Sequence, residues 1–171
     1  SIDLVRRARL PHLRIWVDSP MATAATHLTQ HFFSQLDSQS QITFEWYKKN
    51  PDAVELRFIT DVEESKALNK IKGGAIIISA SGMATGGRVL HHLRSMAPDY
   101  KNSVVFAGYQ AGGTRGAKMV AGDKTVRIFG EDVPVNAEVV SLPSMSAHAD
   151  ARQLIDWLKT LKRPPQHIFI T

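Results

Sequence analysis

The stretch AIIISASGMATGGRVLHHL, residues 75–93, joins a short apolar run to a glycine-rich loop and the first turns of an amphipathic helix. Residues 75–79 are nearly all apolar, which is typical of a strand buried on both faces of a parallel sheet. Val89, Leu93 and Met96 then recur with the spacing of one helix face. A strand, a tight loop and a helix in this order predict one unit of an α/β fold.

The same alternation extends along the chain in both directions. Further strands are expected at residues 13–17, 54–60 and 103–108, and further helices at 19–36 and after 60. Ser19 and Pro20 suit the N-cap and the first position of the earlier helix, and Thr60 to Glu63 form a capping-box pattern for the later one. Repeated strand–helix units predict a Rossmann-like parallel sheet with helices on both faces.

Three further features complete the expected fold. Leu28, Phe32 and Leu36 predict a buried stripe on the first long helix, and Pro51 is expected to end any helix in the polar stretch before it. After residue 122 the helical period disappears and the chain contains Gly130-Glu131-Asp132, which predicts a β-hairpin or a switch to antiparallel strands. A strand–helix–strand piece closes the chain, with its helix at 149–161 and its last strand at 167–171, as if cut from a longer protein.

The composition limits the class of protein. The chain has 171 residues, which fits one domain with a sizeable core. It contains no cysteine, which excludes disulfides, cysteine-based zinc sites and a thiol nucleophile and agrees with a reducing cytosol. No apolar run is long enough to cross a membrane, and the net charge of +5 mildly favours RNA or DNA as a partner. We expect a cytoplasmic protein that does not bind membranes.

The loop of residues 79–88 is the first candidate site. Glycines let an anion approach the backbone, and N–H groups at a helix start attract negative charge. The loop also supplies hydroxyl groups and one guanidinium, so the candidate phosphate contacts are Ser79, Ser81, Gly82, Met83, Thr85 and Arg88. The alternative is that Gly82, Gly86 and Gly87 only make a tight turn. The spacing is not G-x-G-x-x-G, so a dinucleotide site is weakly supported.

Two other motifs lack a residue that their chemistry needs. The stretch GYQAGGT, residues 108–114, imitates a phosphate-binding P-loop but lacks its lysine, so nucleotide hydrolysis is excluded there. Arg115 and Lys118 remain candidates for phosphate contact or for a solvated basic surface. His27 and His31 have the spacing of a zinc protease but lack its glutamate, so they are better explained as flanking the buried stripe.

His148 is the second candidate, in the run Ser146-Ala147-His148-Ala149-Asp150 at the start of the last helix. A histidine there either only begins the helix or donates to an anion. Three residues this close cannot place nucleophile, base and orienting acid in line, so a Ser–His–Asp triad is excluded.

Four stretches together resemble the β-CASP branch of the metallo-β-lactamase nucleases, which are zinc-dependent RNases related to the pre-mRNA 3′-end cleavage enzymes. These stretches are WVDSPMA, IIISASGMATGGRVLHHL, VVFAGYQAGGT and PSMSAHAD, and the likeness runs from about residue 13 to the C-terminus. SAHAD resembles the family's second β-CASP motif. The resemblance implies that His148 contacts the scissile phosphate and protonates the leaving group.

The resemblance also implies a domain division and a cofactor. Residues 1–140 would form the β-CASP domain and 141–171 the start of the returning lactamase segment. The two Zn²⁺ ions of such enzymes are held mostly by the lactamase half, through an H-x-H-x-D-H run that this sequence lacks, so no metal ligand is assigned here. The acidic first motif would precede Ser1, and the His-Gly-Glu third motif would follow Thr171.

We therefore expect a portion of a zinc-dependent ribonuclease that caps the active-site cleft, binds single-stranded RNA and supplies one catalytic histidine. Arg115 and Ser146 join the expected RNA contacts. The partners would be RNA, the lactamase half and a second copy in a homodimer, with exonuclease and endonuclease action both open. The chain alone is expected to be inactive. The alternatives are a Rossmann-like module for a sugar phosphate or nucleotide, and a non-catalytic assembly subunit.

Overall fold

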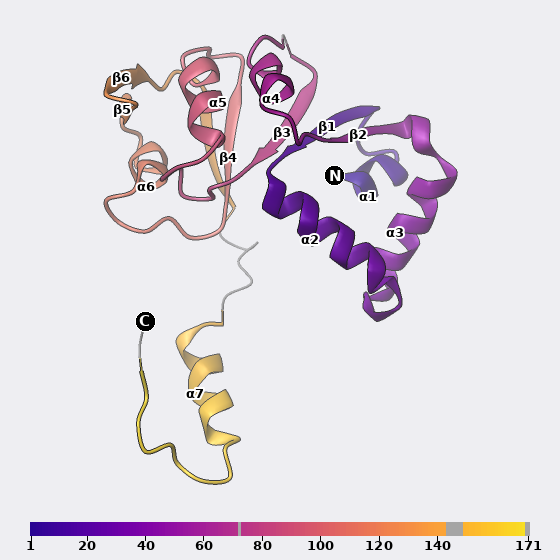
Figure 1. The fold of residues 1–171 in the computed structure, drawn as a ribbon, viewed down its shortest axis with the longest axis vertical. Helices are drawn as coiled ribbons and strands as arrows, with labels where there is room; N and C mark the ends of the chain where they lie inside the picture. Colours follow the sequence, from indigo (N-terminus) through magenta and orange to yellow (C-terminus); the bar gives the residue numbers. More distant parts are fainter. Residues whose placement is uncertain (72, 143–148, 170–171) are drawn as a thin grey trace.

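A computed structural model describes residues 1–71, 73–142 and 149–169, and its centre is a three-stranded parallel sheet (Figure 1). The strands are β1 (Leu13–Asp18), β2 (Val54–Phe58) and β3 (Ala75–Ser79), in the order β2-β1-β3. Ile15 lies opposite both Leu56 and Ile76, which sets one register across the sheet. The three predicted strands are confirmed.

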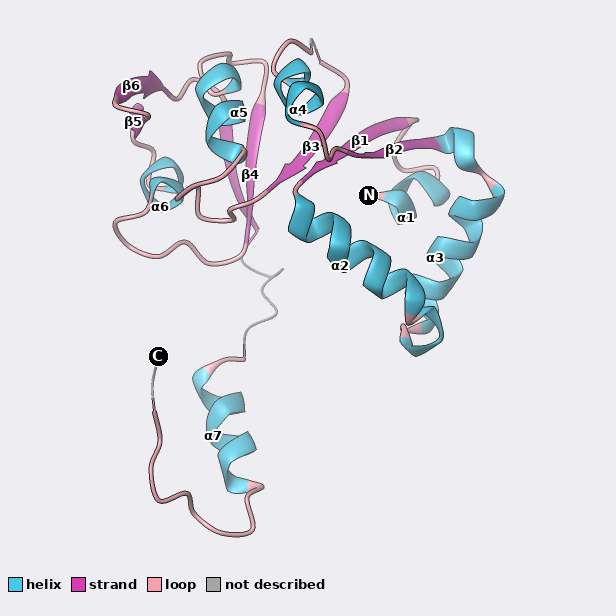
Figure 2. Ribbon diagram, viewed as in Figure 1, coloured by secondary structure: helices cyan, strands magenta, loops and turns pink. Residues whose placement is uncertain are grey.

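Helices cover both faces of this sheet, as predicted (Figure 2). On one face, Trp16 packs in an apolar cluster with Leu68 of α4 (Val62–Leu68). The other face is covered by α1 (Ile2–Arg6), α2 (Pro20–His31) and α3 (Ser38–Lys49). These helices leave the β3 side of that face partly open, since Ile76 and Ile78 remain 39% and 46% exposed. The expectation that β3 is buried on both faces is therefore wrong for one face.

The second half of the chain builds its own core. It contains α5 (Val89–Met96), β4 (Ser103–Ala107), α6 (Arg115–Val120), β5 (Thr125–Ile128), β6 (Glu131–Pro134) and β7 (Glu138–Leu142). β4 pairs in parallel with β7, and β5 pairs with β6 in the predicted hairpin around Gly130. Leu90, Leu93 and Phe106 pack with the fully buried Met119 and Ile128. Figure 1 shows α5 and α6 next to these strands.

The start of α2 agrees with the sequence prediction, but the face predicted to be buried does not. Ser19 Oγ accepts a hydrogen bond from the Ala22 N–H at 3.2 Å, with proline at the first helical position, so the predicted cap is confirmed. The helix ends at His31, and the short 3₁₀ turn η1 (Phe33–Gln35) follows. The predicted buried stripe is wrong, because Leu28 and Phe32 are 60% and 44% exposed.

A different side of α2 contacts the sheet, where the His27 ring lies 5.6 Å from the Phe58 ring. α3 ends at Lys49, before Pro51 in the 3₁₀ turn η2 (Pro51–Ala53), as expected. The cap of α4 is shifted by one residue from the prediction. Asp61, rather than Thr60, accepts the N–H groups of the first turn.

The last described element is α7 (Ala151–Lys159), which confirms the predicted helix. Asp150 accepts the Gln153 N–H while the Gln153 side chain accepts the Asp150 N–H, a reciprocal capping box. None of its apolar side chains is buried, and Trp157 is the most exposed of the large ones. No strand forms over 167–169, the described part of the predicted last strand. Among the described residues, no helix has the length and apolar character that crossing a bilayer requires.

Candidate functional site

The candidate site lies where β1 and β3 end. Asp18 closes β1 and Ser79 closes β3, and the two residues are partners in the sheet register. Ser79 Oγ donates a hydrogen bond to the Asp18 carbonyl oxygen at 3.1 Å. The glycine-rich loop leaves the sheet here and leads into α5. This is the carboxyl edge of a parallel sheet, where α/β proteins bind their ligands.

A buried carboxylate holds this edge together. Asp18 is fully buried; its Oδ2 accepts hydrogen bonds from Ser65 Oγ at 2.6 Å and lies 2.7 Å from His92 Nε2. Its Oδ1 accepts a bond from Arg88 Nη1 at 2.6 Å. Burial by itself raises the pKa of Asp18, but hydrogen bonds from Ser65, Arg88 and His92 outweigh it and hold the pKa below its ordinary value. Asp18 is therefore an ionised anchor between β1, α4 and α5.

Sequence reasoning missed Asp18 and His92. The available signal was an acidic residue ending an otherwise apolar strand, directly before the Ser19-Pro20 helix start. His92 is buried, with its Nδ1 2.7 Å from Asn69 Oδ1, so both of its ring nitrogens face protein atoms. The neighbouring His91 points elsewhere, with its ring 4.6 Å from the Phe129 ring.

Arg88 makes several contacts within the protein. Besides Asp18, its guanidinium donates to the carbonyl oxygens of Ile59 and Thr60 at 3.2 and 3.0 Å. It therefore ties the end of the loop to the segment that follows β2. The arginine side chain is 23% exposed. Its predicted contact with phosphate stays a prediction, while its role in fixing the loop is visible in these distances.

The loop itself is a compact turn. Ser81 Oγ accepts the Thr85 N–H at 3.0 Å and lies 2.9 Å from Thr85 Oγ1, so both hydroxyl groups sit together. Gly87 has a φ of +80°, and a Cβ there would lie 2.9 Å from the Ala80 oxygen, which explains the glycine. Ala84 also has a positive φ, of 52°, and its methyl group is fully buried in the core around α5.

The loop presents backbone donors on its open side. Within the described residues, the N–H groups of Gly82, Met83, Gly86 and Gly87 donate to no protein acceptor. Gly82 and Gly87 are exposed. Successive unpaired N–H groups in a tight turn form a concave site for an anion, and the Ser81 and Thr85 hydroxyls lie in the same turn. The geometry suits a phosphate group.

The described residues do not fit a zinc site. Across 1–71, 73–142 and 149–169, no group of three or more potential ligands comes together. Both oxygens of Asp18 and both ring nitrogens of His92 already face protein partners. Two predicted site residues, Ser146 and His148, lie outside the described residues, so their contacts are not assigned.

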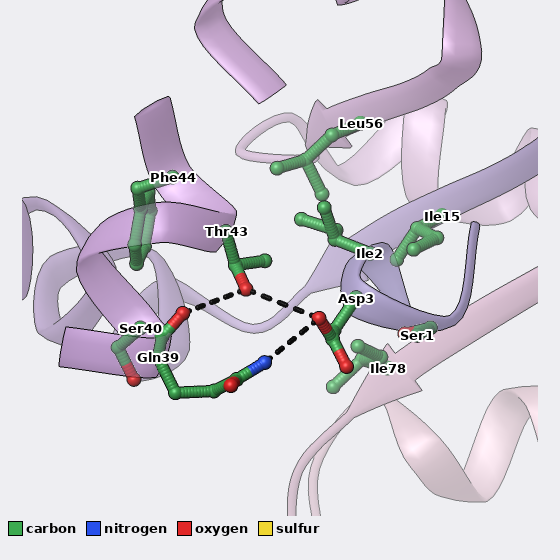
Figure 3. Close-up of a pocket in the computed structure, with 10 residues that line it drawn as sticks. All are labelled: Ser1, Ile2, Asp3, Ile15, Gln39, Ser40, Thr43, Phe44, Leu56 and Ile78. Carbon is green, nitrogen blue, oxygen red and sulfur yellow. Dashed lines mark hydrogen bonds between the residues drawn. The ribbon is translucent and has the colours of Figure 1, made fainter. Parts of the chain in front are cut away.

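A separate open hollow of about 390 Å³ lies between the sheet and the helices α1 and α3 (Figure 3). Ile15, Leu56 and Ile78 of the strands contribute its apolar lining. At its rim, Asp3 Oδ1 accepts a hydrogen bond from Gln39 Nε2 at 2.9 Å. None of the predicted site residues lines this hollow. It is distinct from the loop at the carboxyl edge of the sheet.

Comparison with known proteins identifies the family. Residues 2–119 match the family model described as Beta-Casp domain. The chain belongs to the β-CASP family. Residues 132–171 match a second model, described as Zn-dependent metallo-hydrolase RNA specificity domain. The resemblance seen in the sequence motifs is thereby confirmed, while the predicted domain boundary at 140 stays a prediction.

Several curated relatives support the assignment to the β-CASP family. Ribonuclease TTHA0252 of Thermus thermophilus is 39% identical over 151 residues, covering 88% of this chain and 35% of the relative. Transcription termination factor FttA of Methanococcus maripaludis is 33% identical over 162 residues, covering 90% of this chain and 24% of the relative. An RNase J-like protein of Methanocaldococcus jannaschii is 36% identical over 110 residues, or 64% and 25% of the two chains. The chain thus spans at most about a third of these relatives' length.

Proposed function

We propose that this β-CASP chain is the RNA-binding cap of a metallo-β-lactamase-family ribonuclease that hydrolyses phosphodiester bonds. The observation that carries the proposal is the loop of residues 79–88, whose unpaired N–H groups and paired hydroxyls lie at the ligand-binding edge of the sheet. The ribonuclease name of a relative that covers 88% of this chain supports the choice of RNA.

In this proposal, some residues of the loop bind phosphate and others support the loop. The Ser81 and Thr85 hydroxyls and the Gly82 and Met83 backbone bind a phosphate of single-stranded RNA. Ser79 donates to the Asp18 backbone and so joins the supporting layer beneath the loop. The net charge of +5 adds long-range attraction for the polyanion. None of these groups breaks a bond, so their contribution is binding and orientation.

The bond-breaking residues of the proposal come from elsewhere. His148 is proposed as the general acid that protonates the leaving oxygen, with Ser146 beside it on the phosphate; both assignments rest on the SAHAD sequence. The proposal assigns two Zn²⁺ ions to a lactamase half of the parent protein, as the family resemblance implies; among the described residues no group of three or more potential ligands comes together. Cytoplasmic location and homodimer formation are part of the same proposal.

Titration of a fluorescent single-stranded RNA with the chain at several salt concentrations tests the binding function. Binding should weaken steeply with salt, with a logarithmic slope of about 0.7 for each phosphate contact. The double variant Ser81→Ala/Thr85→Val should bind about tenfold more weakly, as expected for two lost hydrogen bonds. Ser103→Ala is the matched control. Ser103 is the first residue of β4, and its hydroxyl donates to the Glu138 carboxylate on β7, so its removal takes away a hydroxyl outside the loop.

Three results decide between the readings. Unchanged affinity in the double variant would remove the loop from the RNA site. Displacement of the RNA by a nucleoside monophosphate at low concentration would favour the nucleotide-binding alternative. Weaker binding in the double variant alone, with a normal circular dichroism spectrum, supports the RNA-binding cap.

A further inference from the structure

The P-loop-like segment 108–116, which lacks the lysine of a nucleotide-binding P-loop, contacts the backbone of the candidate phosphate loop. It donates hydrogen bonds to four consecutive carbonyl groups of that loop. The bonds are Gln110 Nε2 to Gly82 O at 3.0 Å, Gly116 N to Met83 O at 3.0 Å, and Arg115 Nη1 to Ala84 O and Thr85 O at 3.3 and 3.2 Å. Every carbonyl from 82 to 85 thus faces this one segment.

This contact sets the direction of the N–H groups. In a trans peptide the carbonyl oxygen and the following N–H point to opposite sides of the chain. When the Gly82 and Thr85 carbonyls turn toward segment 108–116, the N–H groups of Met83 and Gly86 turn away from it. Those two N–H groups have no protein acceptor among the described residues. The segment therefore turns carbonyl dipoles away from an incoming anion and leaves donors on the open side.

Arg115 is itself fixed from two directions. Its Nε donates to the Arg127 carbonyl of β5, and it is the first residue of α6, whose N-cap Thr114 accepts the Ala117 N–H at 3.1 Å. Its guanidinium therefore bridges β5 and the loop. Arginine suits this role because its planar group offers several donors in a fixed geometry.

Close packing explains the glycine at 116. A Cβ there would collide with Gln110 Oε1 and would lie 3.1 Å from the Met83 oxygen. Gln110 Oε1 is buried against this glycine and accepts no hydrogen bond within the described chain. The side-chain amide is thus held in place with its Nε2 toward Gly82 even though its oxygen is unsatisfied.

We infer that segment 108–116 is the positioning element of the phosphate loop, and that Arg115 acts on RNA binding through the Ala84 and Thr85 carbonyls and not through a phosphate. The inference rests on the proposed function, since it assigns the support of the same site. Arg115 is a positioning residue here. A direct phosphate contact by Arg115 is the competing outcome.

Substitutions at Arg115 separate the two roles. Arg115→Lys keeps the positive charge but loses the planar guanidinium with its several donors, and Arg115→Ala loses both the charge and the donors. For a positioning residue, both variants should weaken RNA binding about five- to tenfold, with the salt slope of the unmodified chain. Arg94→Ala is the charge-matched control, because that guanidinium pairs with Glu131 at the surface and contacts neither the loop nor segment 108–116; its affinity should stay within about twofold of the unmodified chain.

The opposite pattern overturns the inference. If Arg115→Lys retains the affinity of the unmodified chain and Arg115→Ala lowers the salt slope by about 0.7, the arginine contacts phosphate directly. If the Arg115 variants do not fold, Gln110→Ala is the second test. It removes the bond to Gly82, together with the contacts of the same Nε2 to the Gly108 and Tyr109 carbonyls within the segment, and leaves the bonds to residues 83–85 in place. This variant should still weaken binding by about two- to threefold. Unchanged binding in a folded Gln110→Ala chain counts against the positioning role.

Amide hydrogen exchange keeps this inference distinct from the proposed function. The Ala84 and Thr85 N–H groups donate to Ser81 inside the loop, so their exchange reports whether the loop keeps its shape. Arg115→Lys should speed their exchange while the core strands stay protected. If the unmodified chain binds no RNA, the proposed function fails, and the exchange result still decides the positioning role: faster exchange supports it and unchanged exchange refutes it.

Discussion

Replacing Asp18 by asparagine should be among the most destabilising single-atom changes in this chain. The substitution keeps the shape of the side chain but removes its charge. One carboxylate oxygen becomes an NH₂ group that must face a donor, because Ser65, His92 and Arg88 all point at this carboxylate within 2.7 Å. Water cannot compensate, since Asp18 is fully buried.

The size of the effect follows from these contacts. Hydrogen bonds to a charged group contribute about 1.5–3 kcal/mol each, and removing one partner of a buried ion pair costs about 3–5 kcal/mol. Arg88 is 23% exposed and can recover part of its hydration. We therefore expect a loss of about 3 kcal/mol in the free energy of unfolding, which lowers the melting temperature by about 6–12 °C for a chain of this size.

Urea unfolding followed by far-ultraviolet circular dichroism measures this loss, with an unchanged slope showing that the unfolded state is the same. Asp132→Asn is the matched control. Asp132 also pairs with an arginine, at 3.1 Å, but both side chains are 65% exposed, so its loss should stay below about 0.5 kcal/mol. A loss below about 1 kcal/mol in Asp18→Asn would refute the reasoning.

Four further outcomes follow from the structure. The pKa of Asp18 is lower in the folded chain than in the unfolded chain, so the unfolded chain takes up this proton first as pH falls below about 4. The free energy of unfolding should therefore decrease with acid. Urea unfolding at each pH should show a shallower decrease for Asp18→Asn. Gly87→Ala should cost about 1–3 kcal/mol from its positive φ and the close Ala80 oxygen, whereas Gly86→Ala, with open space around it, should cost much less; equal melting temperatures would contradict this. Ser19→Ala should cost about 1 kcal/mol through the lost cap, again by urea unfolding. The 171-residue chain with added zinc should not cleave labelled RNA on a denaturing gel, and metal-dependent cleavage would show that a metal site is present after all.

The parts of the fold that sequence predicted correctly depend on near neighbours. The Ser19-Pro20 start of α2 needs only the next turn, and the hairpin of β5 and β6 needs only the turn at Gly130 between two short strands. Apolar periodicity on α2 showed that one face is apolar but not which neighbour it meets. In the structure Leu28 and Phe32 lie exposed, and His27 is the α2 side chain that contacts Phe58 of the sheet.

The supporting layer of the site could not be predicted, because its contacts are far apart in sequence. Asp18 meets Ser65, Arg88 and His92 across separations of 47, 70 and 74 residues. Nothing local marks these four residues as partners. Arg88 and Arg115 illustrate the same limit, since a basic residue beside a glycine-rich loop has the same sequence pattern whether it binds phosphate or backbone carbonyls. The loop itself was found because strand, glycines and helix are contiguous.

Position 84 combines two requirements that few side chains meet together. Its backbone lies at a φ of 52°, which disfavours bulky and branched residues, and its methyl group is completely enclosed by the core. Glycine adopts this φ without strain but leaves a cavity in the core where the methyl group was. Any residue larger than alanine is strained at this φ and also does not fit the enclosed space. A saturation library at this codon should therefore retain alanine, tolerate glycine poorly and lose the rest, which makes this one methyl group a sensitive reporter of whether the loop and the core remain joined.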